Sequence, residues 1–214
     1  MLILLPPSEK KKPATGPVNF ELSKLSFAAE LTAARKINLG NFDALQTSPA
    51  FEIYAGVLYQ GLDFQSLSAN ALKTANSKVL IVSALFGLVK PLDQIFSYKR
   101  KIDNNLWRGP IAEVAKKFAN ELVIDCRSST YKGVWPINPA HTVEVRVFKV
   151  VDGERSVITH MSKKYRGELT RHLLQHEIQP ITPAELQQIA AELFECELYP
   201  PIDGLPWTLD LLIS

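Results

Sequence analysis

The run KVLIVSALFGL, residues 78–88, is the strongest apolar stretch of the 214-residue chain. Its β-branched centre favours a strand, and a continuously apolar strand is typical of the middle of a sheet that is covered on both faces. We therefore predict a central strand that ends near Ser83. Two shorter runs, LILL at 2–5 and LVIDC at 122–126, predict further buried strands.

Other segments have apolar residues at helical spacing, or residues that are typical of the start of a helix. TVEVRVFKVVDGERSVITH at 142–160 instead alternates on both sides of Asp152-Gly153, which predicts an antiparallel hairpin. The Pro-rich, then apolar tail predicts an edge segment. The helices we predict are one and part of another in 18–37, 48–56 with Ser48 as N-cap and Pro49 as N1, 65–77, 110–120 starting at Pro110, 162–176 with Ser162 as N-cap, and 182–195 with a capping box of Thr182 and Glu185.

These elements predict an α/β (α+β) fold: a single mixed sheet flanked by helices, in one domain spanning 1–214. With 46% hydrophobic and 21% charged residues, the chain can bury a core, and the composition argues against disorder. Two distant cysteines, Cys126 and Cys196, argue against a disulfide framework. The apolar runs are too short for a membrane span, and the first residues lack signal-peptide features. We expect a cytoplasmic monomer with no membrane association.

Three predicted strands run directly into polar segments that contain a hydroxyl and a cation. They are PPSEKKK after 2–5, the segment ending SYKRK after 78–83, and DCRSSTYKG after 122–126. Ligands of open α/β sheets bind outside the carboxyl ends of the strands, so converging loops would form a basic cleft that the formal net charge of +2 conceals. Taken singly, each segment is more simply a solvated loop. A fourth basic segment, SKKYRG at 162–167, opens a predicted helix.

Carboxylates lie beside these cations at Glu9, Asp93 and Asp125. A carboxylate in a basic cleft could act as a general base or a metal ligand. The alternative, which we favour, is an ion pair that orients a lysine or arginine. Asp125 is the hardest to dismiss, because a carboxylate at the end of a buried strand needs a partner.

No standard nucleotide-binding loop and no hydrolase elbow occurs in the sequence. His172 and His176 are four residues apart on one predicted helix, but no third ligand follows at a usual spacing. We therefore predict no metal and no cofactor. In YAGVLYQGLDF, residues 54–64, glycines 56 and 61 fit either a helix-hairpin-helix element that binds a phosphate backbone or an ordinary corner between packed helices.

Four ordered motifs together resemble the bacterial peroxide stress protein family YaaA, from Met1 to about residue 195. A family pattern Pro-Pro-Ser-Glu-Gly-Lys is met except that Lys10 replaces the glycine, and DCRSSTYKGVW resembles one branch of the family. The matched positions are Pro6, Pro7, Ser8, Glu9 and Lys11; Tyr54, Gly56, Tyr59, Gly61 and Leu62; Ser83, Leu85, Gly87, Leu88, Pro91, Leu92 and Asp93; and Lys164, Arg166 and Gly167.

The resemblance implies a cytoplasmic protein that protects against hydrogen peroxide by limiting free iron and DNA damage. It also implies binding of double-stranded DNA through a basic cleft and a helix-hairpin-helix element. The residues themselves also support an enzyme acting on a small anionic or nucleotide-like substrate. The candidate catalytic residues are Ser8, Glu9 and Asp125, and the candidate DNA- or anion-binding residues are Lys11, Tyr59, Tyr98, Lys99, Arg100, Arg127, Ser128, Lys163, Lys164 and Arg166.

Overall fold

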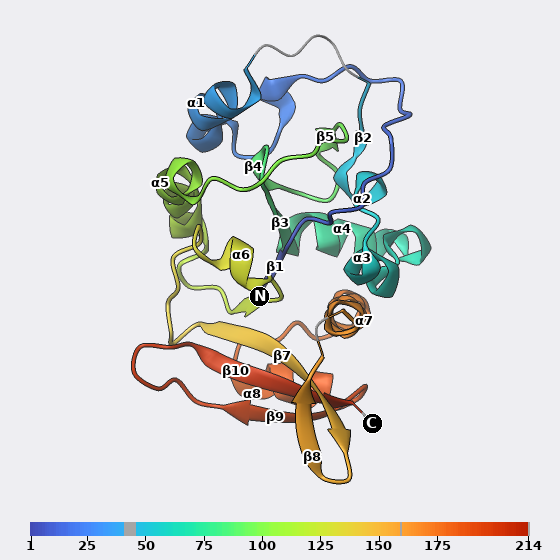
Figure 1. The fold of residues 1–214 in the computed structure, drawn as a ribbon, viewed down its shortest axis with the longest axis vertical. Coiled ribbons are helices and arrows are strands. Elements are labelled where there is room, and N and C mark those ends of the chain that lie inside the picture. The colour runs from blue at the N-terminus through green and yellow to red at the C-terminus, as the bar shows by residue number, and fades with distance from the viewer. Residues whose placement is uncertain (41–45, 159, 214) are drawn as a thin grey trace.

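The computed structural model describes residues 1–40, 46–158 and 160–213. Within them, one mixed sheet of eight strands forms the spine of the molecule, in the order β4-β3-β1-β6-β7-β10-β9 with β8 paired to β7 (Figure 1). A small second sheet joins β2 to β5. The strands are β1 Leu2–Leu5, β2 Ser48–Pro49, β3 Val79–Ser83, β4 Gly87–Val89, β5 Gln94–Ile95, β6 Val123–Asp125, β7 Thr142–Val151, β8 Glu154–Val157, β9 Glu195–Tyr199 and β10 Trp207–Ile213.

Helices cover both faces of the part of the sheet that contains β3, β1 and β6. The α-helices are α1 Ala28–Leu39, α2 Ala50–Ile53, α3 Val57–Leu62, α4 Ala69–Lys78, α5 Asn104–Ala115, α6 Ser129–Lys132, α7 Ser162–Gln175 and α8 Pro183–Ala190, and the short 3-10 helices are η1 Leu22–Lys24, η2 Phe64–Ser66 and η3 Lys116–Phe118. No helix in the described part of the chain is both long enough and apolar enough to cross a membrane.

The three apolar runs found in the sequence are confirmed as strands, and they are neighbours. β1 lies between β3 and β6 and is parallel to both. β6 in turn is parallel to β7. The carboxyl ends of β1, β3 and β6 therefore meet at one edge of the sheet. The polar segments that follow these strands can converge only in such an arrangement.

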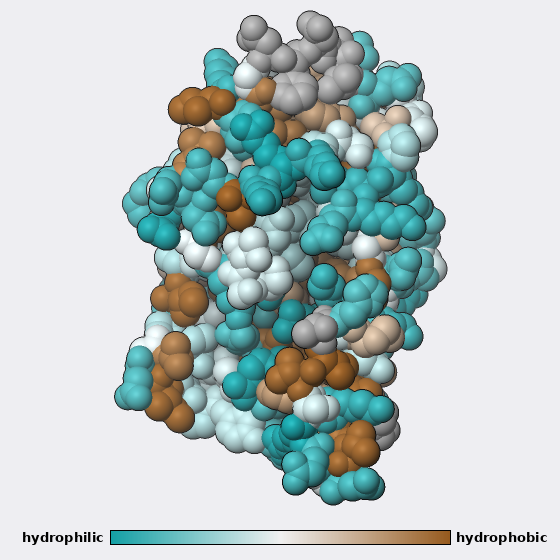
Figure 2. Space-filling model, viewed as in Figure 1, coloured by the Kyte–Doolittle hydropathy of each residue, from teal (hydrophilic) through white to brown (hydrophobic). Residues whose placement is uncertain are grey.

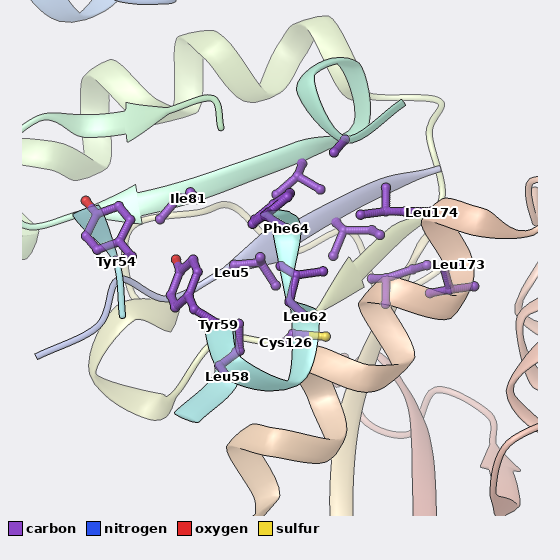
Figure 3. Packing of buried hydrophobic residues seen from close by; sticks show 14 of the residues in the cluster. Leu5, Tyr54, Leu58, Tyr59, Leu62, Phe64, Ile81, Cys126, Leu173 and Leu174 are labelled. Atoms are coloured by element: carbon purple, nitrogen blue, oxygen red, sulfur yellow. The ribbon is translucent and has the colours of Figure 1, made fainter. Parts of the chain in front are cut away.

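Alternation along β1 divides the core into two layers. Ile3 and Leu5 face α3, α4 and α7, and Figure 3 shows part of this packing. Leu2 and Leu4 face the opposite layer, which includes α1 and α5. All four side chains are buried, and each contributes about 2 kcal/mol through removal of apolar surface from water.

Two local predictions are confirmed in detail. The hairpin between β7 and β8 turns at Asp152 and Gly153, both with positive φ (53° and 81°), as a tight two-residue turn requires. The helix α8 begins with the predicted capping box, in which the Thr182 side chain accepts from the Glu185 amide and the Glu185 carboxylate accepts from the Thr182 amide.

Other predicted boundaries are wrong. Pro110 lies inside α5, which begins six residues earlier because the Asp103 carboxylate caps the amides of Asn105 and Leu106. Ser48 does not cap a helix. Its Oγ accepts from the amides of Thr15 and Gly16, 3.1 and 3.2 Å away, and so holds the N-terminal loop.

The start of α7 and the C-terminal tail also differ from prediction. Ser162 is the first residue of α7 and Met161 occupies the N-cap. The tail is not an edge segment, because β10 lies between β7 and β9. Its Leu209 and Leu211 are fully buried, which favours an internal position over an edge.

The helices α3 and α7 touch backbone to backbone. A Cβ placed on Gly167 would lie 2.0 Å from the Leu58 carbonyl oxygen, and one on Gly61 would lie 2.3 Å from the Lys164 carbonyl oxygen. Gly61 is thus inside α3 rather than in a turn, and only glycine permits so close an approach. This contact sets where the basic first turn of α7 lies.

Candidate functional site

The loop after β1 is joined to the α2–α3 connection by hydrogen bonds. The Lys12 amide donates to the Ile53 carbonyl over 2.8 Å. The Ala55 amide donates to the Lys10 carbonyl over 3.1 Å and to Ser8 Oγ over 3.0 Å. Two motifs that are about 45 residues apart in the sequence, PPSEKKK and YAGVLYQGL, thereby form one structure at the carboxyl edge of the sheet.

A chain of buried hydroxyl groups extends this structure to the end of β3. The hydroxyls of Tyr54 and Tyr98 share a hydrogen bond of 3.1 Å, and those of Tyr98 and Ser83 one of 2.7 Å. The Phe86 amide donates to Ser83 Oγ over 3.0 Å. Burial raises the pKa of Tyr98 to about 12, so the phenol stays protonated at neutral pH. The sequence prediction omitted Tyr54 from the site, although its place in the Tyr-x-Gly-x-x-Tyr motif was a usable signal.

Tyr59 lies deeper than a nucleic-acid contact would. Its ring stacks on that of Tyr54, with centroids 5.3 Å apart, and its hydroxyl donates to the Pro6 carbonyl over 2.7 Å. Figure 3 shows both rings above α3, beside the strand ends. Burial raises the Tyr59 pKa well above its usual value. Tyr59 therefore anchors the loop after β1 and is buried.

Lys11 lies over the aromatic rings of Tyr98 and Tyr54. Its Nζ is 4.4 Å from the centroid of the Tyr98 ring and 5.7 Å from that of Tyr54, and it donates to the Ser8 carbonyl over 2.6 Å. Burial lowers the pKa of Lys11, and the nearby Glu9 carboxylate partly opposes this shift. Glu9 itself is exposed. Ser8, Glu9 and Lys11 thus share one loop, and its Lys11 lies beside the Tyr98 and Tyr54 rings.

Asp125 and Arg127 form a buried ion pair at the end of β6. Arg127 donates through Nε and Nη2 to the two carboxylate oxygens over 2.9 and 2.7 Å, with side-chain exposures of 0% for Arg127 and 3% for Asp125. Its Nη1 donates to the Tyr131 carbonyl over 2.8 Å. The Arg127 guanidinium is therefore enclosed, and its hydrogen bonds are made within the protein. Ser128 follows half-buried at the N-cap of α6.

Asp93 is likewise engaged within the fold. Its carboxylate accepts from Ser26 Oγ over 2.7 Å and from the Lys90 amide over 2.9 Å, and burial raises its pKa. It holds a turn of the segment between β4 and β5. Arg35, which the sequence reasoning did not single out, is fully buried and donates to the Phe86 and Leu88 carbonyls over 2.9 and 2.7 Å.

Two further basic motifs adjoin groups at the same edge, one through Tyr98, which bonds Ser83 at the end of β3, and one through Arg166, which is near Cys126 after β6. Lys99 and Arg100 directly follow Tyr98 and are exposed. Lys163 and Lys164 are exposed on the first turn of α7, with Lys164 Nζ 3.3 Å from Glu168. Arg166 is half-buried close to Cys126, whose pKa it tends to lower. Its Nε is buried and has no hydrogen-bond partner among the described residues.

His172 and His176 face one carboxylate, that of Glu192, at 2.9 and 3.3 Å. No group of three His, Cys, Asp or Glu side chains suited to a metal ion occurs in residues 1–40, 46–158 and 160–213.

Comparison with known proteins gives the family. Residues 21–198 match the family model of the peroxide stress protein YaaA. The chain belongs to this family. A UPF0246 protein of Streptomyces coelicolor is 34% identical, over 100% of this chain and 98% of the relative. A UPF0246 protein of Corynebacterium glutamicum is 32% identical over 89% and 91%, and one of Rickettsia rickettsii 27% identical over 71% and 67%. Membership links the chain to the peroxide stress response.

Proposed function

We propose that this YaaA family protein binds double-stranded DNA during peroxide stress, through the carboxyl edge of its sheet. The contact surface, called the strand-edge surface below, consists of Lys11, Lys99, Arg100, Lys163, Lys164 and Arg166. The observation that carries the proposal is the meeting of these cations, from three segments far apart in the sequence, around one edge. We further propose that it acts as a cytoplasmic monomer.

The charge of this surface is largely uncompensated. Lys99, Arg100 and Lys163 form no ion pair with any carboxylate in the described residues. Lys163 and Lys164 also lie on the first turn of α7, where the helix dipole disfavours cations. Phosphate groups would relieve both costs, since they bring negative charge to the lysines and to the helix N-terminus.

The proposal does not depend on a helix-hairpin-helix element. Gly61 packs against α7, and a Cβ on Gly56 would lie 2.8 Å from the Ser8 side chain, so both glycines serve contacts within the protein. The amide of Ala55, which directly precedes Gly56, donates to Ser8 Oγ. Figure 2 shows hydrophilic side chains over much of the middle of one face, above apolar patches that lie over β7 to β10.

Fluorescence anisotropy of a labelled duplex across a salt series tests the proposal. Six phosphate contacts would give a slope of log affinity against log salt of about −5, since each contributes roughly −0.9. The double variant Lys163→Ala/Lys164→Ala should reduce the slope by about 2. The matched control Lys36→Ala/Lys116→Ala removes the same charge from exposed positions in the α1 and α5 layer and should change the slope far less.

Equal slopes for both double variants would place the phosphates elsewhere, and no binding at low salt would exclude duplex binding altogether. In that case the alternative is an enzyme that acts on a small anionic or nucleotide-like substrate. The proximity of Ser8, Glu9 and Lys11 supports this second function. Binding of a fluorescent nucleotide that a plain duplex fails to displace would favour it.

A further inference from the structure

Lys11 differs from its neighbours in the same loop. Lys10 and Lys12 are exposed, whereas Lys11 is partly enclosed. Its Nζ contacts uncharged groups: the Ser8 carbonyl and the faces of the Tyr98 and Tyr54 rings. No carboxylate of the described residues lies within ion-pair distance of its Nζ.

This environment suits an amine that acts as a nucleophile. Burial lowers the Lys11 pKa, so a larger fraction is neutral at a given pH than for an ordinary lysine. The Tyr98 ring centroid lies 4.4 Å from the amine, and the Tyr98 hydroxyl is hydrogen-bonded to those of Tyr54 and Ser83. The exposed Glu9 carboxylate is close enough to act electrostatically on both Lys11 and Tyr131.

We propose that Lys11 forms a Schiff base with an aldehyde of a ligand bound at the strand-edge surface. In duplex DNA, such an aldehyde is the ring-opened sugar left where a base has been lost. This DNA form of the inference rests on the proposed function. A small phosphorylated sugar offers the same chemistry from a second source.

The reaction is a condensation without oxidation or reduction. The Lys11 ammonium first gives one proton to the Glu9 carboxylate or to water. The neutral Nζ then attacks the carbonyl carbon, a C–N bond forms as the C=O π bond breaks, and one proton moves from nitrogen to oxygen to give a carbinolamine. Loss of that hydroxyl as water, with the remaining proton leaving nitrogen, gives the imine.

Reductive trapping tests the inference. Sodium cyanoborohydride supplies a hydride that converts the imine to a stable amine. The protein is incubated with the cyanoborohydride in three parallel reactions. One contains an abasic duplex, one an intact duplex and one 2-deoxyribose 5-phosphate. We expect a covalent adduct that peptide mapping by mass spectrometry places on Lys11. Trapping of the abasic duplex alone would identify DNA as the source, whereas trapping of the sugar phosphate to the same extent would identify the small ligand.

The variants keep the charge and therefore the phosphate attraction. Lys11→Arg should reduce the adduct at least tenfold, whereas Lys10→Arg and Lys12→Arg should leave it unchanged. Adduct spread over several lysines, or none with either aldehyde while anisotropy still shows duplex binding, would overturn the inference and leave the proposed function standing. Mapping of the wild-type adduct decides the matter even where Lys11→Arg fails to fold.

Discussion

The contact between α3 and α7 makes a quantitative prediction for Gly167→Ala. The added methyl would lie 2.0 Å from the Leu58 carbonyl oxygen and 2.9 Å from the Leu62 nitrogen. A normal carbon–oxygen contact is about 3.3 Å, so the helices must separate by about 1.3 Å. Both obstacles are backbone atoms inside α3, and no side chain can move to relieve them.

Two effects of this substitution oppose each other. Overpacking of a closed contact costs about 3 kcal/mol at the upper end of its usual range, and here the backbone must move. Alanine in place of glycine inside a helix returns about 1 kcal/mol. The free energy of unfolding should therefore fall by about 2 kcal/mol, which corresponds to a Tm lower by about 4–8 °C in a chain of this size.

Urea unfolding followed by circular dichroism, with a thermal scan beside it, measures this loss. The matched control is Gly133→Ala at the end of α6, where φ is −66° and the new methyl would meet only the side-chain amide of Asn104 at 3.3 Å. We expect a change below about 0.5 kcal/mol there. If Gly167→Ala left the Tm unchanged or raised it, the helices would not be in backbone contact and the placement of the α7 cations would need revision.

Three further results are expected. Asp125→Asn should lower the free energy of unfolding in urea by about 3–5 kcal/mol, because it leaves Arg127 charged and buried without a counter-ion. Glu113→Gln, in an exposed ion pair, should lower it by under about 1 kcal/mol, and similar losses for both variants would contradict the buried pair. Burial raises the pKa of Cys126 to about 12, so its thiol should not react with an aromatic disulfide reagent at pH 8 until urea unfolds the chain; rapid labelling of native Cys126 would refute this. Tyr98→Phe should lower stability by about 1 kcal/mol in urea, since Ser83 loses a hydrogen bond, and a spectrophotometric titration should show one fewer tyrosine ionising near pH 12.

Local signals explain what the sequence predicted well. The turn at Asp152-Gly153 and the capping box at Thr182 depend on residues within four positions of each other, and the structure confirms both. The buried strands 2–5 and 78–83 were readable from apolar composition alone. Where local signals competed, the prediction failed: Pro110 was read as a helix start, while Asp103 provides the cap.

The candidate site was predictable in part. The rule that ligand sites form at the carboxyl ends of parallel strands grouped Lys11 with the end of β3, and in the structure Lys11 lies over Tyr98, which is hydrogen-bonded to Ser83. The sequence prediction treated Lys99 and Arg127 alike, although a local signal separated them: Arg127 has a carboxylate two residues away and Lys99 has none within three. Their difference arises because Asp125 lies two residues before Arg127 at the end of a buried strand.

The sequence by itself determined the three buried strands, the β7–β8 hairpin and the capped start of α8, because those preferences act over a few neighbouring residues. Only the tertiary structure decided that β1 lies between β3 and β6, that β10 is internal, and that Lys11 lies over Tyr98. Such contacts join residues tens to over a hundred positions apart. They depend on strand order and on backbone contacts such as that between Gly167 and Leu58, which periodicity and composition do not encode.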